Sequence, residues 1–72
     1  MFKNKSQIVL MIYDRLNKGK QILLVEIMNE FDISLSTFRR YISEINIFLS
    51  DTYQNKVVYY DFLTNSYYLK EI

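Results

Sequence analysis

The 72-residue chain carries nine Lys and Arg residues against eight Asp and Glu residues, a formal net charge of +1. Half of the residues are apolar and 17% are aromatic, which supports a packed core and excludes a disordered tail. The sequence has neither cysteine nor histidine, so disulfides and sites built on thiolate or imidazole ligands are excluded. Because the charge is almost balanced, nucleic-acid binding has to be argued from where the basic residues lie.

The length predicts a single domain over residues 1–72, near the lower limit for a self-sufficient core. No apolar run approaches the roughly 20 residues that span a bilayer. Residues 1–6 are not followed by an apolar stretch of signal-peptide character. We therefore expect a cytoplasmic protein that does not associate with membranes.

The first predicted helix covers residues 5–18 and is followed by a short extended segment at residues 20–23. Ser6 is the candidate N-cap, because its hydroxyl can accept a hydrogen bond from a free amide of the first turn. Gly19 stands where a helix end often needs a left-handed residue. The extended segment can add a small third strand to a later hairpin. Apolar residues recur at helical spacing on one face of the helix, at Ile8, Val9, Ile12 and Leu16.

Two further helices are predicted over residues 23–31 and 34–49, separated by a tight break. Ser34 is a good N-cap for the third helix. The core stripe of the second helix consists of Leu24, Ile27, Met28 and Phe31. That of the third consists of Phe38, Ile42, Ile45 and Leu49. The opposite side of the third helix holds Ser36, Thr37, Arg40, Ser43 and Glu44, with Arg39 and Tyr41 on its two flanks.

Residues 56–60 and 67–71 are rich in valine and tyrosine and are predicted as two strands of a hairpin. Adjacent residues of a strand point to opposite faces, so one tyrosine of each pair is expected on the third helix and the other in solvent. Phe62 and Leu63 are unusual residues for the tip of such a hairpin. The expected fold class is α+β, with three helices followed by a two-stranded hairpin. The two tyrosine pairs are Tyr59 with Tyr60 and Tyr67 with Tyr68.

Two short helices joined by a three-residue break, the second capped by Ser34, form a helix-turn-helix pattern. In this motif the second helix lies in the major groove, where its N-terminal outward residues meet base edges and phosphates. Arginine can bind guanine O6 and N7 with two hydrogen bonds, and free amides at a helix start can hold a phosphate. The candidate DNA-binding residues are Ser34, Ser36, Thr37, Arg39, Arg40, Tyr41, Ser43 and Lys56.

Residues 31–45, which read FDISLSTFRRYISEI, resemble the helix-turn-helix of DeoR-type bacterial repressors. That family segment typically reads phenylalanine-glycine-valine-serine, two variable residues, then threonine-isoleucine-arginine-arginine-aspartate-leucine. Residues 46–69 resemble the helix-turn-helix domains of Mga-like and PTS-regulatory-domain activators. The resemblance covers nearly the whole chain and implies a winged helix-turn-helix with the hairpin as its wing. Its most specific part is the spacing of Ser34, Thr37, Arg39 and Arg40, which implies that Thr37 and Arg40 face DNA and Arg39 lies near the backbone.

The chain departs from the family pattern at two positions of the motif. Asp32 replaces the usual glycine of the turn and can adopt the left-handed conformation, though less easily than glycine. Its negative charge near the DNA face is expected to weaken phosphate contacts. Tyr41 replaces the usual aspartate after the two arginines. Full-length family members also carry a sensor or oligomerisation domain that this chain lacks, so no small-molecule ligand is expected.

The leading prediction is a sequence-specific binder of double-stranded DNA, a small transcriptional regulator of phage or mobile-element type. It is expected to need no cofactor. No enzymatic activity is expected, because the sequence offers no nucleophile–base pair, metal cluster or glycine-rich phosphate loop. The composition, rich in Ile, Asn, Lys and Tyr, is typical of an AT-rich bacterial or phage genome. The cell is therefore expected to be bacterial or a phage-infected host.

Two alternatives use different chemistry. One is a winged-helix protein-interaction module, an inhibitor or adaptor that does not bind DNA, favoured by the near-neutral charge and the surplus of aromatic residues. The other is a single-stranded DNA binder that stacks bases on the hairpin tyrosines. Self-association to a homodimer, which would favour palindromic sites, is expected from apolar residues outside the core stripes. These residues are Met11, Tyr13, Ile47 and Phe48.

Overall fold

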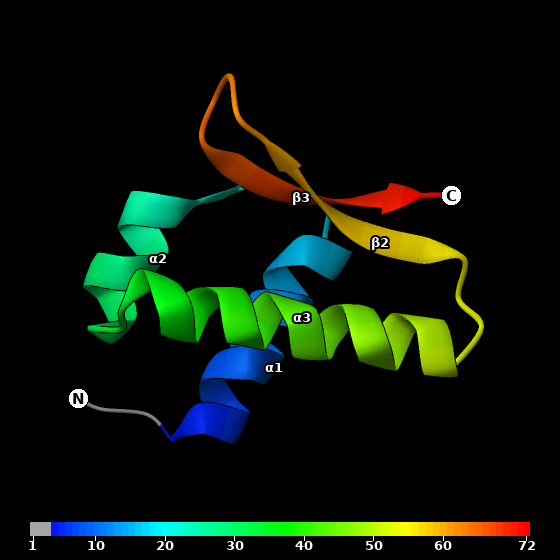
Figure 1. The fold of residues 1–72 in the computed structure, drawn as a ribbon, viewed down its shortest axis with the longest axis horizontal. Coiled ribbons are helices and arrows are strands. Elements are labelled where there is room, and N and C mark those ends of the chain that lie inside the picture. The colour runs from blue at the N-terminus through cyan, green and yellow to red at the C-terminus, as the bar shows by residue number, and fades with distance from the viewer. Residues whose placement is uncertain (1–3) are drawn as a thin grey trace.

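The computed structural model describes residues 4–72, which form three helices and one three-stranded antiparallel sheet in an α+β arrangement (Figure 1). The sheet order is β1-β3-β2, so the hairpin predicted with two strands gains a third, from the segment predicted as extended. No helix within residues 4–72 is long and apolar enough to cross a membrane. The elements are α1 (Lys5–Asn17), β1 (Ile22–Leu23), α2 (Leu24–Phe31), α3 (Leu35–Asp51), β2 (Lys56–Asp61) and β3 (Ser66–Glu71).

Helix α1 begins one turn earlier than its predicted cap. The Asn4 side chain accepts from the Gln7 backbone amide at 2.9 Å, and the Gln7 side chain accepts from the Asn4 amide at 3.3 Å. This reciprocal capping box satisfies two amides at once, so the prediction of Ser6 as N-cap is wrong. At the other end Gly19 adopts the predicted left-handed conformation, with φ of 82°.

The turn between α2 and α3 follows the local signals of the sequence. Asp32 adopts the left-handed conformation with φ of 53°, and the Ile33 amide donates to the Met28 carbonyl at 3.1 Å. Ser34 is the N-cap of α3, as predicted, because its hydroxyl accepts from the Thr37 amide at 3.2 Å. These contacts fix the angle at which α3 leaves α2.

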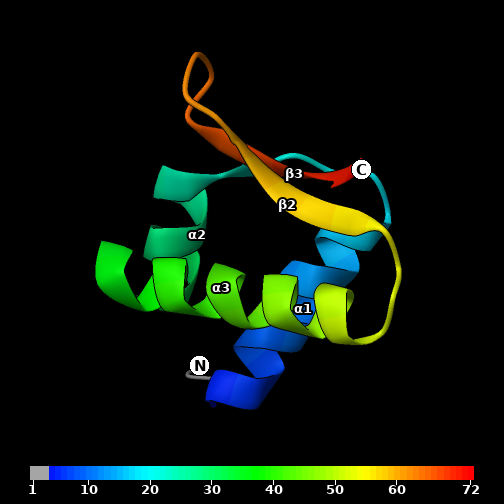
Figure 2. The same cartoon turned by 45° about the vertical axis from the view of Figure 1, so that its right-hand side comes forward.

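The core lies between the helices and the inner face of the sheet. In Figures 1 and 2, α1 passes behind α3 and the sheet lies above both helices. Phe38 of α3 is fully buried, and its ring meets that of Tyr67 of β3 edge-on, with centroids 4.9 Å apart. Each buried side chain of this size contributes about 1.5–3 kcal/mol relative to an exposed one. The core therefore holds α3 against the sheet and leaves its opposite face to solvent.

Arg15 joins α1 to α2 through two hydrogen bonds from its guanidinium to the Glu30 carboxylate, at 2.8 and 2.5 Å. The guanidinium also lies over the ring of Phe31, 5.7 Å from its centroid. The hydrogen bond from Arg15 lowers the pKa of Glu30, and the same bond raises the pKa of Arg15. This pair orients the two helices that precede α3.

Candidate nucleic-acid interface

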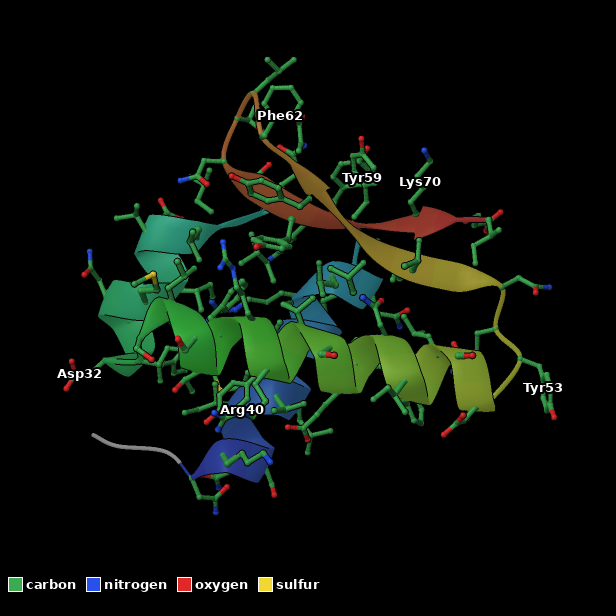
Figure 3. The ribbon with its side chains drawn as sticks, viewed as in Figure 1. Asp32, Arg40, Tyr53, Tyr59, Phe62 and Lys70 are labelled. Atoms are coloured by element: carbon green, nitrogen blue, oxygen red, sulfur yellow. The ribbon has the colours of Figure 1, made fainter. Side chains whose placement is uncertain are left out.

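The exposed face of α3 carries four residues in one line. Positions 36, 40, 43 and 47 are spaced by four, three and four, so they share the helix face that points away from the core. The structure brings together Ser36, Arg40 and Ser43, as predicted, and leaves all three exposed. Ile47, which is 57% exposed, continues the same line. Figure 3 shows Arg40 on the outer side of α3, away from the sheet.

The two arginines of this face carry positive charge that no carboxylate neutralises. Three ion pairs occur within residues 4–72, and none includes Arg39 or Arg40. Glu44, on the flank of the same helix, instead pairs with Lys5 of α1 at 3.0 Å. An exposed guanidinium without a partner can give all its donors to a phosphate or to a base edge.

Arg39 lies on the flank of α3 that faces the sheet. Its positive charge acts on the hydroxyl of Tyr67, whose pKa is raised by burial and lowered in part by Arg39. Arg39 itself is exposed, so its position beside the hairpin leaves it open to a ligand that lies across α3 and the sheet. The two arginines therefore point to different parts of one surface.

The N-terminal turn of α3 is already organised by its cap. The Ser34 hydroxyl accepts from the Thr37 amide and donates to the Thr37 hydroxyl oxygen at 3.1 Å, so it is occupied within the protein. The Thr37 hydroxyl keeps its own hydrogen for an outside acceptor. Among the described residues, the amides of Leu35 and Ser36 have no partner, and both lie at the positive end of a 17-residue helix. The exposed carboxylate of Asp32, which projects outward in Figure 3, opposes this positive end.

Two predicted site residues lie elsewhere. Tyr41 is only 7% exposed and belongs to the core, so its prediction as a DNA-facing residue is wrong. Its position three residues after Phe38 and four before Ile45 was the signal that extends the core stripe to it. Lys56 is half-buried at the start of β2, beside the C-terminal end of α3, and lines a hollow with Ser50. Lys56 therefore does not join the arginines.

The four residues predicted for self-association do not form one surface. Tyr13 and Phe48 meet edge-on, with ring centroids 5.7 Å apart, and line an apolar groove of about 280 Å³ between α1 and α3. Met11 is half-buried and packs against the core, while Ile47 lies on the outward face of α3. Leu10, which is 64% exposed, also lines the groove and was not predicted.

The tyrosines of the hairpin divide between the two faces of the sheet. In β3, Tyr67 is buried and Tyr68 is half-buried, as the alternation predicted, whereas in β2 both tyrosines are partly exposed. The Tyr59 ring lies 5.3 Å from that of Tyr68, and the Lys70 ammonium lies 4.9 Å from the centre of the Tyr59 ring. Figure 3 shows Tyr59 and Lys70 together on the outer face of the sheet. Tyr59 is thus already engaged within the protein.

Comparisons with protein families, with curated proteins and with solved structures find no match for this chain. The resemblance of residues 31–45 to DeoR-type repressors therefore stays a prediction. The argument for function rests on the exposed face of α3 and on the cap that precedes it.

Proposed function

We propose that the chain is a winged helix-turn-helix domain that binds double-stranded DNA in a sequence-specific manner, with α3 in the major groove and the β2–β3 hairpin as the wing. The observation that carries the proposal is the unpaired positive charge of Arg39 and Arg40 on an exposed helix face. A major groove about 12 Å wide admits one helix with its outward side chains. The fold supports this because the sheet and α1 hold α3 from behind.

Each part of the face has a task in this proposal. Arg40 lies in line with Ser36 and Ser43 and reads base edges, where a bidentate pair with guanine is worth about 1–3 kcal/mol of discrimination. Arg39 and the Thr37 hydroxyl bind the phosphates that border the groove. Ile47 offers an apolar contact to a thymine methyl group. The proposed role is that of a small transcriptional regulator of phage or mobile-element type in the bacterial cytoplasm, without catalysis.

A second candidate, a protein-interaction module, is favoured by the apolar groove between α1 and α3. Leu10 and Phe48 expose 64% and 47% of their surface there. We place the proposed homodimer at this groove, because it lies on the flank of α3 opposite the sheet and leaves the outward face free. Single-stranded DNA binding is less favoured, because Tyr59 is already covered by Tyr68 and Lys70.

Amide chemical-shift mapping with a random duplex separates these functions. We expect the largest changes at Ser36, Arg39, Arg40 and Ser43, and small changes at Leu10 and Phe48. The same duplex without one strand should give weaker changes. Shifts confined to the groove, or changes that are equal for the two strand forms, would count against major-groove binding by α3.

A further inference from the structure

The tip of the β2–β3 hairpin displays two large apolar side chains that have no role in the core. Phe62 is 75% exposed and Leu63 is 83% exposed, and the two are adjacent in the chain. Figures 1 and 2 show the tip rising beyond the body, at the end of the molecule where α2 and the start of α3 lie. In Figure 3 the Phe62 ring stands at this tip, away from the rest of the protein. Burial inside this chain therefore does not explain either residue.

The turn that carries these side chains is braced by its own polar groups. The Asp61 carboxylate accepts from the Leu63 amide at 3.0 Å, and the Tyr60 hydroxyl donates to the Asn65 side-chain oxygen at 2.6 Å. The hydroxyls of Thr64 and of the fully buried Ser66 lie 2.6 Å apart. A turn held in this way loses little conformational entropy on binding.

We propose that the hairpin tip is a DNA wedge that inserts the Phe62 and Leu63 side chains between base pairs of the minor groove and bends the duplex. This inference rests on the proposed function and goes beyond it. Proteins that kink DNA use apolar side chains of this kind to unstack a base step. Pyrimidine–purine steps are the easiest to open, so the wedge would favour TA and CA steps beside the segment bound by α3.

The shape and charge of the tip favour DNA over a protein partner. A narrow convex turn with two apolar side chains offers little area, whereas a stable protein interface buries about 800 Å² on each partner. Residues 61–66 contain no lysine or arginine, so the tip contacts no phosphate through a cation. Its contribution to affinity should therefore be independent of salt, unlike that of the arginines.

The test compares the wild-type chain with Phe62→Ser/Leu63→Ser on a duplex of about two helical turns that carries central TA steps. Affinity is measured by fluorescence anisotropy at several salt concentrations, bending by energy transfer between the duplex ends, and unstacking by 2-aminopurine fluorescence at the TA step. We expect the variant to bind about tenfold more weakly with the same salt slope, and to lose both the bend and the 2-aminopurine signal. Tyr53→Asn, which replaces another aromatic residue that is 89% exposed, should change none of the three readouts.

The outcomes separate the wedge from the proposed function. If the tip variant binds and bends the duplex like wild type while Arg39→Ala/Arg40→Ala loses binding, the wedge is wrong and the proposed function stands. A tip variant that changes only the sedimentation coefficient would make the tip a protein contact, which also overturns the wedge. If wild type binds no duplex, the wedge and the proposed function fail together.

Discussion

Asn46 joins the candidate DNA-binding helix to the hairpin, and removing its side chain should loosen both. Its Oδ1 atom accepts from the Val58 amide of β2 at 2.7 Å in a partly buried contact. Asn46→Ala leaves that amide without an acceptor, which typically costs about 1–3 kcal/mol. Because Asn46 is only half-buried, the change creates little cavity, so we expect the free energy of unfolding to fall by about 1–2 kcal/mol.

Chemical denaturation and amide hydrogen exchange measure this effect. The midpoint should shift with little change in slope, and the Val58 amide should lose protection more than its neighbours in β2. Asn46→Asp is the matched control, because its carboxylate keeps an acceptor at the same place and should retain most of the stability. Equal losses for Asn46→Ala and Asn46→Asp, or an unchanged Val58 exchange rate, would refute the role of this hydrogen bond.

Three further predictions follow from single contacts. Tyr53 follows α3 with φ of 56°, so Tyr53→Gly should relieve about 1–2 kcal/mol of left-handed strain, less about 0.4–1 kcal/mol of glycine entropy. Thermal unfolding should show a net gain, and a lower midpoint would contradict it. Glu30→Gln should cost less than about 1 kcal/mol at neutral pH, since the Arg15–Glu30 pair is partly exposed. Because Arg15 lowers the pKa of Glu30 below its model value of 4.5, this contribution is present above that pH and lost as pH falls through the lower folded pKa; a difference that persists in acid would exclude the pair as its cause. Asp32→Gly removes a negative charge beside the start of α3 and should strengthen duplex binding about twofold at low salt, an effect that high salt should abolish.

The sequence predicts the helices and their ends well where the signals are local. Ser34 and Asp32 have the expected cap and left-handed geometry, because each depends only on neighbouring backbone groups. The third strand is harder to predict, because β1 has only two residues and exists through its pairing with Tyr67 and Ser66 of β3. The N-cap of α1 was missed because Asn4 and Gln7 act as a pair.

The site is predictable only in part, because a helical wheel gives the direction of a side chain but not what lies beside it. Ser36, Arg40 and Ser43 point directly away from the core and were found. Tyr41 lies on a flank, where packing against the rest of the core decides that it is buried. The pairing of Glu44 with Lys5 also depends on a segment about 40 residues away, so the unpaired state of the arginines was not visible in the sequence.

The salt dependence of duplex binding tests the central claim most directly. The dissociation constant of wild type for a random duplex is measured from low to moderate salt, beside Arg39→Ala/Arg40→Ala and the charge-matched control Lys18→Ala/Lys20→Ala. We predict a steep salt slope for wild type and the control. For the arginine variant we predict a loss of at least about tenfold in affinity, with a slope that is shallower by up to about 1.8 for two lost phosphate contacts. Wild-type binding that is absent or insensitive to salt, or an arginine variant that binds like the lysine control, would contradict DNA recognition by the exposed face of α3.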